Sequence, residues 1–289
     1  MFQGAITAIV TPFSSGKVDY DCFEKLIEHQ IKDGIDGIVP CGTTGESPTL
    51  SHEEHKEVIR FAVDIVRKRV PVIAGTGSNN TEEAIELTQH AAQCGADGAL
   101  VVNPYYNKPT QEGLYRHFTA IADSCDIPIV LYNIQSRTGV NMIPQTVIRL
   151  SHHKKVVAIK EASGSLEQAM DIINGTKDFS VISGDDSLTL PLCSIGGRGV
   201  ISVISNLIPG ETARFVSHCL KGDFSSARDF QYRYLNVMKA LFTETSPVPI
   251  KQALNLMGKC QADVRLPLCE IDSGNLETLK TAMKEAKLI

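Results

Sequence analysis

One lysine is better placed than any other residue of this chain for covalent chemistry. Lys160 closes the short apolar run 156–159 and is followed by Glu161. Such a β-branched run is typical of a buried parallel strand, where an unpaired ammonium group is uncommon. Burial lowers the pKa of a lysine from ~10.4, and an amine near ~7–8 attacks carbonyl carbons, so the run predicts a Schiff-base nucleophile. A lysine that snorkels, or that pairs with Glu161, fits the same run.

Polar residues that follow other apolar runs offer complementary chemistry. The loop Gly42-Thr43-Thr44-Gly45-Glu46 could hold a carboxylate or phosphate with hydroxyl and N–H groups, or it could be a plain turn. Tyr132 ends another run, where a phenol could relay the protons of imine formation or simply fill the core. Arg137 follows it and could clamp a carboxylate with two hydrogen bonds, although a surface arginine fits equally.

The runs that carry these residues belong to a regular alternation of strands and helices. We expect strands at 5–10, 37–40, 71–74, 98–102, 127–132, 156–160, 179–183 and 199–204. We expect helices between and after them near 20–33, 51–69, 81–94, 111–125, 144–151, 165–174, 186–195 and 209–220. Eight apolar strands separated by helices predict an α/β fold, a closed (β/α)8 TIM barrel; a doubly wound open sheet is the alternative.

The last quarter of the chain lacks strand patterns. Residues 223–243, 247–258 and 274–288 have helical periodicity. We therefore expect a catalytic barrel at 1–222 and a C-terminal helical extension at 223–289. In such a barrel the active site lies at the carboxyl ends of the strands, where Lys160, Tyr132 and the 42–46 loop are all expected.

Composition and motifs exclude several other functions. A net charge of -5 does not favour nucleic-acid or anionic-membrane binding. The eight cysteines form no C-x-x-C pair and no secretory signal is evident, which favours reduced thiols and the cytoplasm. Neither His52-Glu53-Glu54-His55 nor Asp185-Asp186 has the spacing or the third ligand of a metal site, so no metal is expected. Gly75-Thr76-Gly77 begins like a dinucleotide-binding motif, but Asn80 replaces its third glycine.

Taken together, these motifs are specific to one family. The chain resembles the pyruvate-dependent class I aldolases over nearly its whole length, and within them the branch that forms dipicolinate precursors. The motifs that carry the resemblance are Gly42-Thr43-Thr44-Gly45-Glu46, Tyr105-Tyr106, Tyr132-Asn133 through Arg137-Thr138-Gly139, and Ile159-Lys160-Glu161-Ala162. Relatives that cleave N-acetylneuraminate or 2-keto-3-deoxysugar acids share the lysine and the tyrosine. They generally lack the double threonine together with the arginine.

The resemblance implies a role for each of these residues. Lys160 would form a Schiff base with pyruvate, so that the intermediate is covalent and no cofactor is needed. Tyr132, Thr44 and Tyr106, the last from a neighbouring subunit, would relay protons. Thr43 and Thr44 would hold the pyruvate carboxylate, Arg137 would bind the carboxylate of L-aspartate 4-semialdehyde, and Gly184 and Ile201 would line the pocket. The expected assembly is a homotetramer, a dimer of dimers, at the entry to lysine and diaminopimelate biosynthesis.

A feedback site for L-lysine is also implied. The matching residues are Ser47, His52, His55, Asn79, Glu83 and Tyr105. Two residues depart from the family pattern: Pro48 replaces a small residue at this site, and Gln135 replaces a frequent proline before Ser136. They bear on inhibitor affinity and on the loop that presents Arg137. A sugar-acid aldolase and a catalytically silent pyruvate-binding protein are the alternative functions on the same scaffold.

Overall fold

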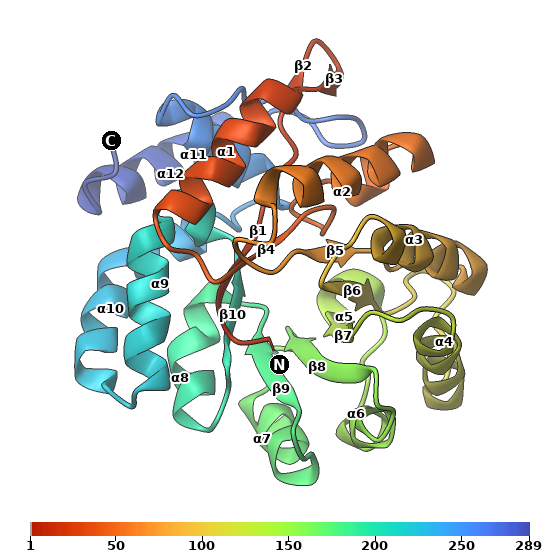
Figure 1. Cartoon of the computed structure of the whole chain (residues 1–289). Helices are drawn as coiled ribbons and strands as arrows, with labels where there is room; N and C mark the ends of the chain where they lie inside the picture. Colours follow the sequence, from red (N-terminus) through yellow and green to blue (C-terminus); the bar gives the residue numbers. More distant parts are fainter. Residues whose placement is uncertain (1) are drawn as a thin grey trace.

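The computed structural model describes residues 2–289, which form a β-barrel surrounded by helices (Figure 1). The eight strands are β1 (Gly4–Ala8), β4 (Gly37–Val39), β5 (Ile73–Gly75), β6 (Gly98–Val102), β7 (Ile129–Asn133), β8 (Val156–Glu161), β9 (Ser180–Ser183) and β10 (Gly199–Ser202). All pairings in this sheet are parallel, in the order β4-β1-β10-β9-β8-β7-β6-β5. A parallel bridge between Ile38 and Val72 joins the two ends of the sheet. The TIM-barrel prediction is therefore confirmed, and the open-sheet alternative is wrong.

Helices alternate with the strands as the periodicity predicted. They are α1 (Tyr20–Lys32), α2 (His52–Val66), α3 (Thr81–Gln93), α4 (Gln111–Asp123), α6 (Pro144–Ser151), α7 (Leu166–Gly175), α8 (Thr189–Ser194) and α9 (Pro209–Leu220). The boundaries differ from prediction by a few residues. For example, α2 ends at Val66 rather than 69, because Arg67 adopts a left-handed conformation (φ 50°) that stops the helix.

Two small elements were not predicted. β2 (Phe13–Ser14) and β3 (Lys17–Val18) form a hairpin, and α5 (Gln135–Thr138) is a single helical turn after β7. The 3-10 turns η1 (Ser47–Thr49), η2 (Asp186–Leu188) and η3 (Ile204–Asn206) follow β4, β9 and β10. These elements all lie in connections rather than in the repeating units.

The C-terminal extension is helical, as predicted. It contains α10 (Phe224–Ala240), α11 (Val248–Leu256) and α12 (Ser273–Glu285). Its buried side chains join α1 and α9 in one apolar cluster, and Figure 1 shows α10 beside α9 on the outside of the barrel. The division of the chain at residue 222 stays a prediction.

A glycine begins the turn from helix to strand at two equivalent places in the chain. Gly34 and Gly95 follow α1 and α3 with φ +86°, a left-handed conformation that costs glycine little. Asp36 and Asp97 come two residues later, and their carboxylates accept hydrogen bonds from backbone N–H groups of the adjacent strand region at 2.8 and 2.9 Å.

No helix within residues 2–289 combines the length and the apolar character needed to cross a membrane.

Candidate active site

Lys160 and Tyr132 lie side by side at the carboxyl ends of adjacent strands. They are register partners in the β7–β8 pairing, and the Lys160 Nζ atom lies 4.3 Å from the centroid of the Tyr132 ring. Both residues are buried, with 6% and 5% of their surface exposed. The structure therefore brings together the predicted nucleophile and the predicted proton-transfer group.

The Glu161 carboxylate is engaged by other groups. It accepts hydrogen bonds from the Ser163 N–H at 2.7 Å and from the Asn133 and Gln168 side-chain amides, each at 3.2 Å. Successive residues of a strand point to opposite faces, so Glu161 is directed away from the face that carries Lys160. The snorkelling or salt-bridged lysine considered from the sequence is therefore wrong.

Gly184 makes room for the lysine side chain. A methyl group at this position would lie 2.6 Å from Ala162 Cβ and 3.1 Å from Lys160 Cε. Only a residue without a side chain permits this approach. Ile201 lies on β10 at 1% exposure, in the apolar cluster that fills the barrel interior together with Tyr132. Gly184 thus contacts Lys160 and Ile201 packs with Tyr132, while their expected contact with the substrate stays a prediction.

The threonine loop after β4 is a compact double turn. The Gly45 N–H donates to the Gly42 carbonyl at 3.0 Å, and the Glu46 N–H donates to the Thr43 carbonyl at 3.1 Å. Because these N–H groups are used within the loop, the expected carboxylate cradle reduces to the hydroxyl and N–H groups of Thr43 and Thr44. Thr44 is 4% exposed, while Thr43 borders a cavity.

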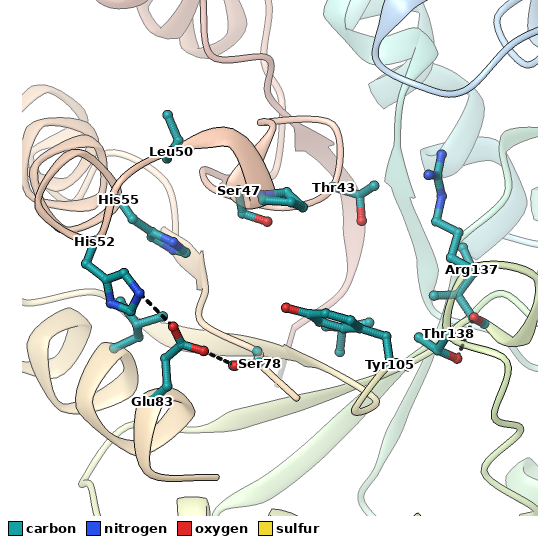
Figure 2. Close-up of a pocket in the computed structure, with 15 residues that line it drawn as sticks. Thr43, Ser47, Leu50, His52, His55, Ser78, Glu83, Tyr105, Arg137 and Thr138 are labelled. Atoms are coloured by element: carbon teal, nitrogen blue, oxygen red, sulfur yellow. Dashed lines mark hydrogen bonds and ion pairs between the residues drawn. The ribbon is translucent and has the colours of Figure 1, made fainter. Parts of the chain in front are cut away.

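Arg137 extends from the one-turn helix α5 toward the same cavity (Figure 2). One guanidinium nitrogen donates to the Ser246 carbonyl at 3.4 Å, which links α5 to the C-terminal extension. Gln135 occupies the first position of α5, where an N–H has no intrahelical partner and proline is also favoured. The Gln135 substitution therefore fits the turn that presents Arg137.

A cavity of about 340 Å³ extends from the Arg137 end of the site to the residues expected to bind lysine. Thr43, Arg137 and Thr138 border one end, and Ser47, His52, His55 and Glu83 border the other. Figure 2 shows the Tyr105 ring between these two groups. The cavity thus joins Thr43 and Arg137 to residues of the expected lysine site, and Lys160 and Tyr132 are not among its lining residues.

Hydrogen bonds fix the polar side chains of that second end. Glu83 pairs with His52 at 2.8 Å and accepts a hydrogen bond from Ser78 (Figure 2). His55 Nε2 donates to the Gly75 carbonyl at 2.7 Å, and burial lowers the pKa of this imidazole and favours its neutral form.

Three further residues complete the predicted sets. Pro48 also borders the cavity, within η1. The Asn79 carbonyl accepts a hydrogen bond from the Asn107 side chain at 2.9 Å, and Asn79 does not line the cavity. Tyr106 is 88% exposed, with φ +70°, so the single chain does not bury it against its own Tyr132.

A buried ion pair behind the threonine loop was not predicted from the sequence. Lys251 of α11 donates to Glu46 at 2.5 Å, and both side chains are 0% exposed. Glu46 closes the loop motif at residues 42–46, but no role was predicted for its side chain. Lys251 lies among Val248, Ile250, Ala253 and Leu254. A lysine among apolar residues was the signal that identified Lys160, and it could have identified this one.

Within the described part of the chain, no group of three or more His, Cys, Asp or Glu side chains is arranged to hold a metal ion.

Comparisons with known proteins agree on one family. The model of the dihydrodipicolinate synthetase family matches residues 1–286. A curated 4-hydroxy-tetrahydrodipicolinate synthase of Syntrophus aciditrophicus is 58% identical over the full length of both chains.

Two solved structures are similar throughout. The chloride-inhibited dihydrodipicolinate synthase of Acinetobacter baumannii complexed with pyruvate is 43% identical, with a TM-score of 0.98 and full coverage of both chains. The enzyme of Cyanidioschyzon merolae with lysine bound is 46% identical, with a TM-score of 0.97, and the match covers 100% of this chain and 99% of that one.

Proposed function

The chain belongs to the dihydrodipicolinate synthetase family, whose members are lyases of the class I aldolase type, and we propose that it condenses pyruvate with L-aspartate 4-semialdehyde to form 4-hydroxy-tetrahydrodipicolinate. The observation that carries this proposal is the buried Lys160, whose amine lies over the Tyr132 ring and whose neighbouring carboxylate is engaged elsewhere. This step would begin lysine and diaminopimelate biosynthesis.

The proposed chemistry starts at the Lys160 amine. Its nitrogen attacks the keto carbon of pyruvate, and loss of water leaves an imine. Removal of a proton from the pyruvate methyl group gives an enamine, which forms a carbon–carbon bond to the aldehyde carbon of the semialdehyde. The amino group of that substrate then attacks the imine carbon, which closes the ring and releases the Lys160 amine. Tyr132, Thr44 and Tyr106 would carry the protons that these steps exchange.

The carboxylates of the two substrates would bind at different places. Thr43 and Thr44 would hold the carboxylate of pyruvate, close to Lys160. The Arg137 guanidinium would hold the carboxylate of the semialdehyde, because its planar fork suits two parallel hydrogen bonds. The relative from A. baumannii, described as complexed with pyruvate, supports pyruvate as the first substrate.

Feedback inhibition by L-lysine is the second part of the proposal. Glu83 and the histidines at the far end of the cavity suit an amino acid, since Glu83 can accept an ammonium group. The relative from C. merolae with lysine bound supports this assignment. Because this cavity also borders Thr43 and Arg137, bound lysine would share it with two of the residues expected to bind the substrates. Pro48 would tune the affinity, because it borders the same space.

We also propose a homotetramer in the cytoplasm. An aromatic side chain as exposed as Tyr106 supports an interface that covers it, in which it would enter the site of a neighbouring subunit. Eight free cysteines support a reducing compartment. Sedimentation of the wild type should give a tetramer, and a monomer that turns over at full rate would refute the shared site.

Two assays test the catalytic proposal. Reduction by borohydride in the presence of pyruvate should add the substrate carbon skeleton to Lys160, as located by peptide mapping; modification of another residue would refute the mechanism. Condensation with the semialdehyde should be rapid, and N-acetylneuraminate cleavage should be undetectable. The opposite specificity would assign the chain to the sugar-acid aldolases.

A substitution at Glu83 tests the proposed inhibition by lysine. Glu83→Gln removes the negative charge expected to bind an ammonium group, and it should raise the lysine concentration needed for half-inhibition about tenfold or more. The turnover rate without lysine should change little. An unaltered inhibition curve would refute the assignment.

A further inference from the structure

The threonine loop is held from behind by the C-terminal extension. Lys251 Nζ donates to Glu46 Oε1 at 2.5 Å, between residues 205 positions apart in the chain. Both side chains are completely buried. Desolvation opposes such a pair, so it is favourable only when its geometry and its other hydrogen bonds are well satisfied.

Those conditions are met on the lysine side. The Lys251 ammonium also donates to the Asp263 carbonyl at 2.8 Å and lies 4.0 Å from the centroid of the Phe13 ring. The ammonium is thus surrounded by a carboxylate, a carbonyl and an aromatic face. It has no access to substrate, because the residue is 0% exposed.

The carboxylate side is equally complete. Glu46 Oε2 accepts hydrogen bonds from the Thr49 hydroxyl at 3.1 Å and from the Arg265 N–H at 3.2 Å. Arg265 in turn pairs with Glu54 at 2.6 Å, so that the extension contacts both the β4–α2 connection and the first turn of α2. Lys251 and Arg265 of the C-terminal extension therefore hold this connection in place through ion pairs and hydrogen bonds.

The loop needs such an anchor. Glu46 adopts a left-handed backbone conformation (φ 54°, ψ 36°), which is uncommon for a residue with a side chain. Its N–H closes the turn onto the Thr43 carbonyl, and the preceding Gly45 carbonyl accepts a hydrogen bond from Thr11 at 2.6 Å. A shift of Glu46 would therefore move Thr43 and Thr44 directly.

We infer that Lys251 and Glu46 are positioning residues for the reaction: their buried ion pair fixes the loop so that Thr43 and Thr44 meet the carboxylate of pyruvate. This inference rests on the proposed function, because it assumes that pyruvate binds beside Lys160. It assigns the C-terminal extension a role in substrate binding, in addition to its packing against the barrel.

The test compares two ketones. Pyruvate and acetone both form a borohydride-reducible imine with an amine, but acetone has no carboxylate. Lys251→Met removes the ammonium, and the double variant Lys251→Met/Glu46→Gln leaves no buried charge without a partner. In both, labelling of Lys160 by subsaturating pyruvate should fall about tenfold or more, while acetone labelling should stay within about twofold of wild type.

A matched control uses the same extension. Lys259 lies in the same extension and is partly buried. It contacts His29 and the Leu207 carbonyl instead of the threonine loop. Lys259→Met should leave both labelling rates at the wild-type level. A loss of pyruvate labelling in this variant as large as in Lys251→Met would overturn the inference.

The remaining outcomes are equally decisive. Wild-type labelling by pyruvate in either folded variant of the pair, or an equal loss with both ketones, would overturn the inference. If Lys251→Met does not fold, the double variant decides, because replacing both partners avoids an isolated buried charge. Failure of the proposed function itself would appear separately, as a wild-type enzyme whose Lys160 is not labelled by pyruvate.

Discussion

Replacing Gly184 by alanine should slow imine formation through steric contact with Lys160, the proposed nucleophile. The new methyl group would lie 2.6 Å from Ala162 Cβ, 3.1 Å from Lys160 Cε and 3.2 Å from Lys160 Cγ. Carbon atoms in favourable contact are roughly 3.5–4.0 Å apart, so the methyl intrudes by about 1 Å on Ala162 and by about half as much on Lys160. The backbone of Gly184 is not in the left-handed region, so alanine adds no conformational strain.

Two magnitudes follow from this overlap. Inserting one methyl into packed surroundings costs about 1–3 kcal/mol of folding free energy. Displacing a nucleophile by a fraction of an ångström to 1 Å slows its reaction by about 10- to 100-fold. The rate of borohydride trapping with pyruvate should therefore fall by that factor, while the fold persists.

The assay combines that trapping rate with unfolding in urea. The chain has no tryptophan, so unfolding is best followed by far-ultraviolet circular dichroism. The double variant Ala162→Gly/Gly184→Ala removes the closest contact but leaves those to Lys160, so it should recover stability more fully than rate. Wild-type trapping in a folded Gly184→Ala enzyme would refute the reasoning, as would a double variant that recovers rate and stability equally.

Three other predictions concern single side chains. Tyr132→Phe keeps the ring beside Lys160 but removes the phenol, so kcat should fall about 100-fold or more with an unchanged urea midpoint; a wild-type kcat would exclude the phenol from proton transfer. Arg137→Lys keeps the charge but loses the fork, so KM for the semialdehyde should rise about tenfold while KM for pyruvate does not; equal changes in both would contradict the assignment. Burial lowers the pKa of His117 to about 4, so its contribution to stability is complete above about pH 6.5 and is lost as the pH falls toward 4, by roughly 3 kcal/mol. Urea unfolding of His117→Gln should lack this component between pH 6.5 and 4, and an acid sensitivity equal to that of the wild type would disprove it.

Most of the barrel could be predicted because its units repeat one pattern. A continuous apolar run followed by an amphipathic run indicates a strand buried on both faces and a helix that covers it. The β2–β3 hairpin and α5 escaped prediction because strands of two residues and a helix of four are shorter than the periods that reveal them. Their conformations depend on contacts with distant parts of the chain.

The candidate site was predictable to the extent that it lies at strand ends. Topology places Lys160, Tyr132 and the threonine loop on one side of the barrel, so their positions in the sequence sufficed. The Lys251–Glu46 pair was not predictable in this way, because it joins α11 to a loop more than 200 residues away. No periodicity links the two, and only the folded chain brings them together.

The two buried lysines show that burial alone does not specify function. Burial lowers the pKa of Lys251, and its carboxylate partner Glu46 opposes that lowering. Lys160 has an aromatic ring beside it, and the nearest carboxylate in the sequence, that of Glu161, is held on the opposite face by Ser163, Asn133 and Gln168.

Strand geometry explains this difference. Because Lys160 and Glu161 are adjacent in the sequence, an ion pair between them was one alternative. Successive side chains of a strand point to opposite faces, so two adjacent residues of β8 lie on different sides of the sheet. A counter-ion would fix the proton on the amine and occupy the space that a keto acid needs. The proposed nucleophile therefore depends as much on the position of Glu161 on the other face as on the apolar strand around Lys160, and a register shift of one residue in β8 would abolish it.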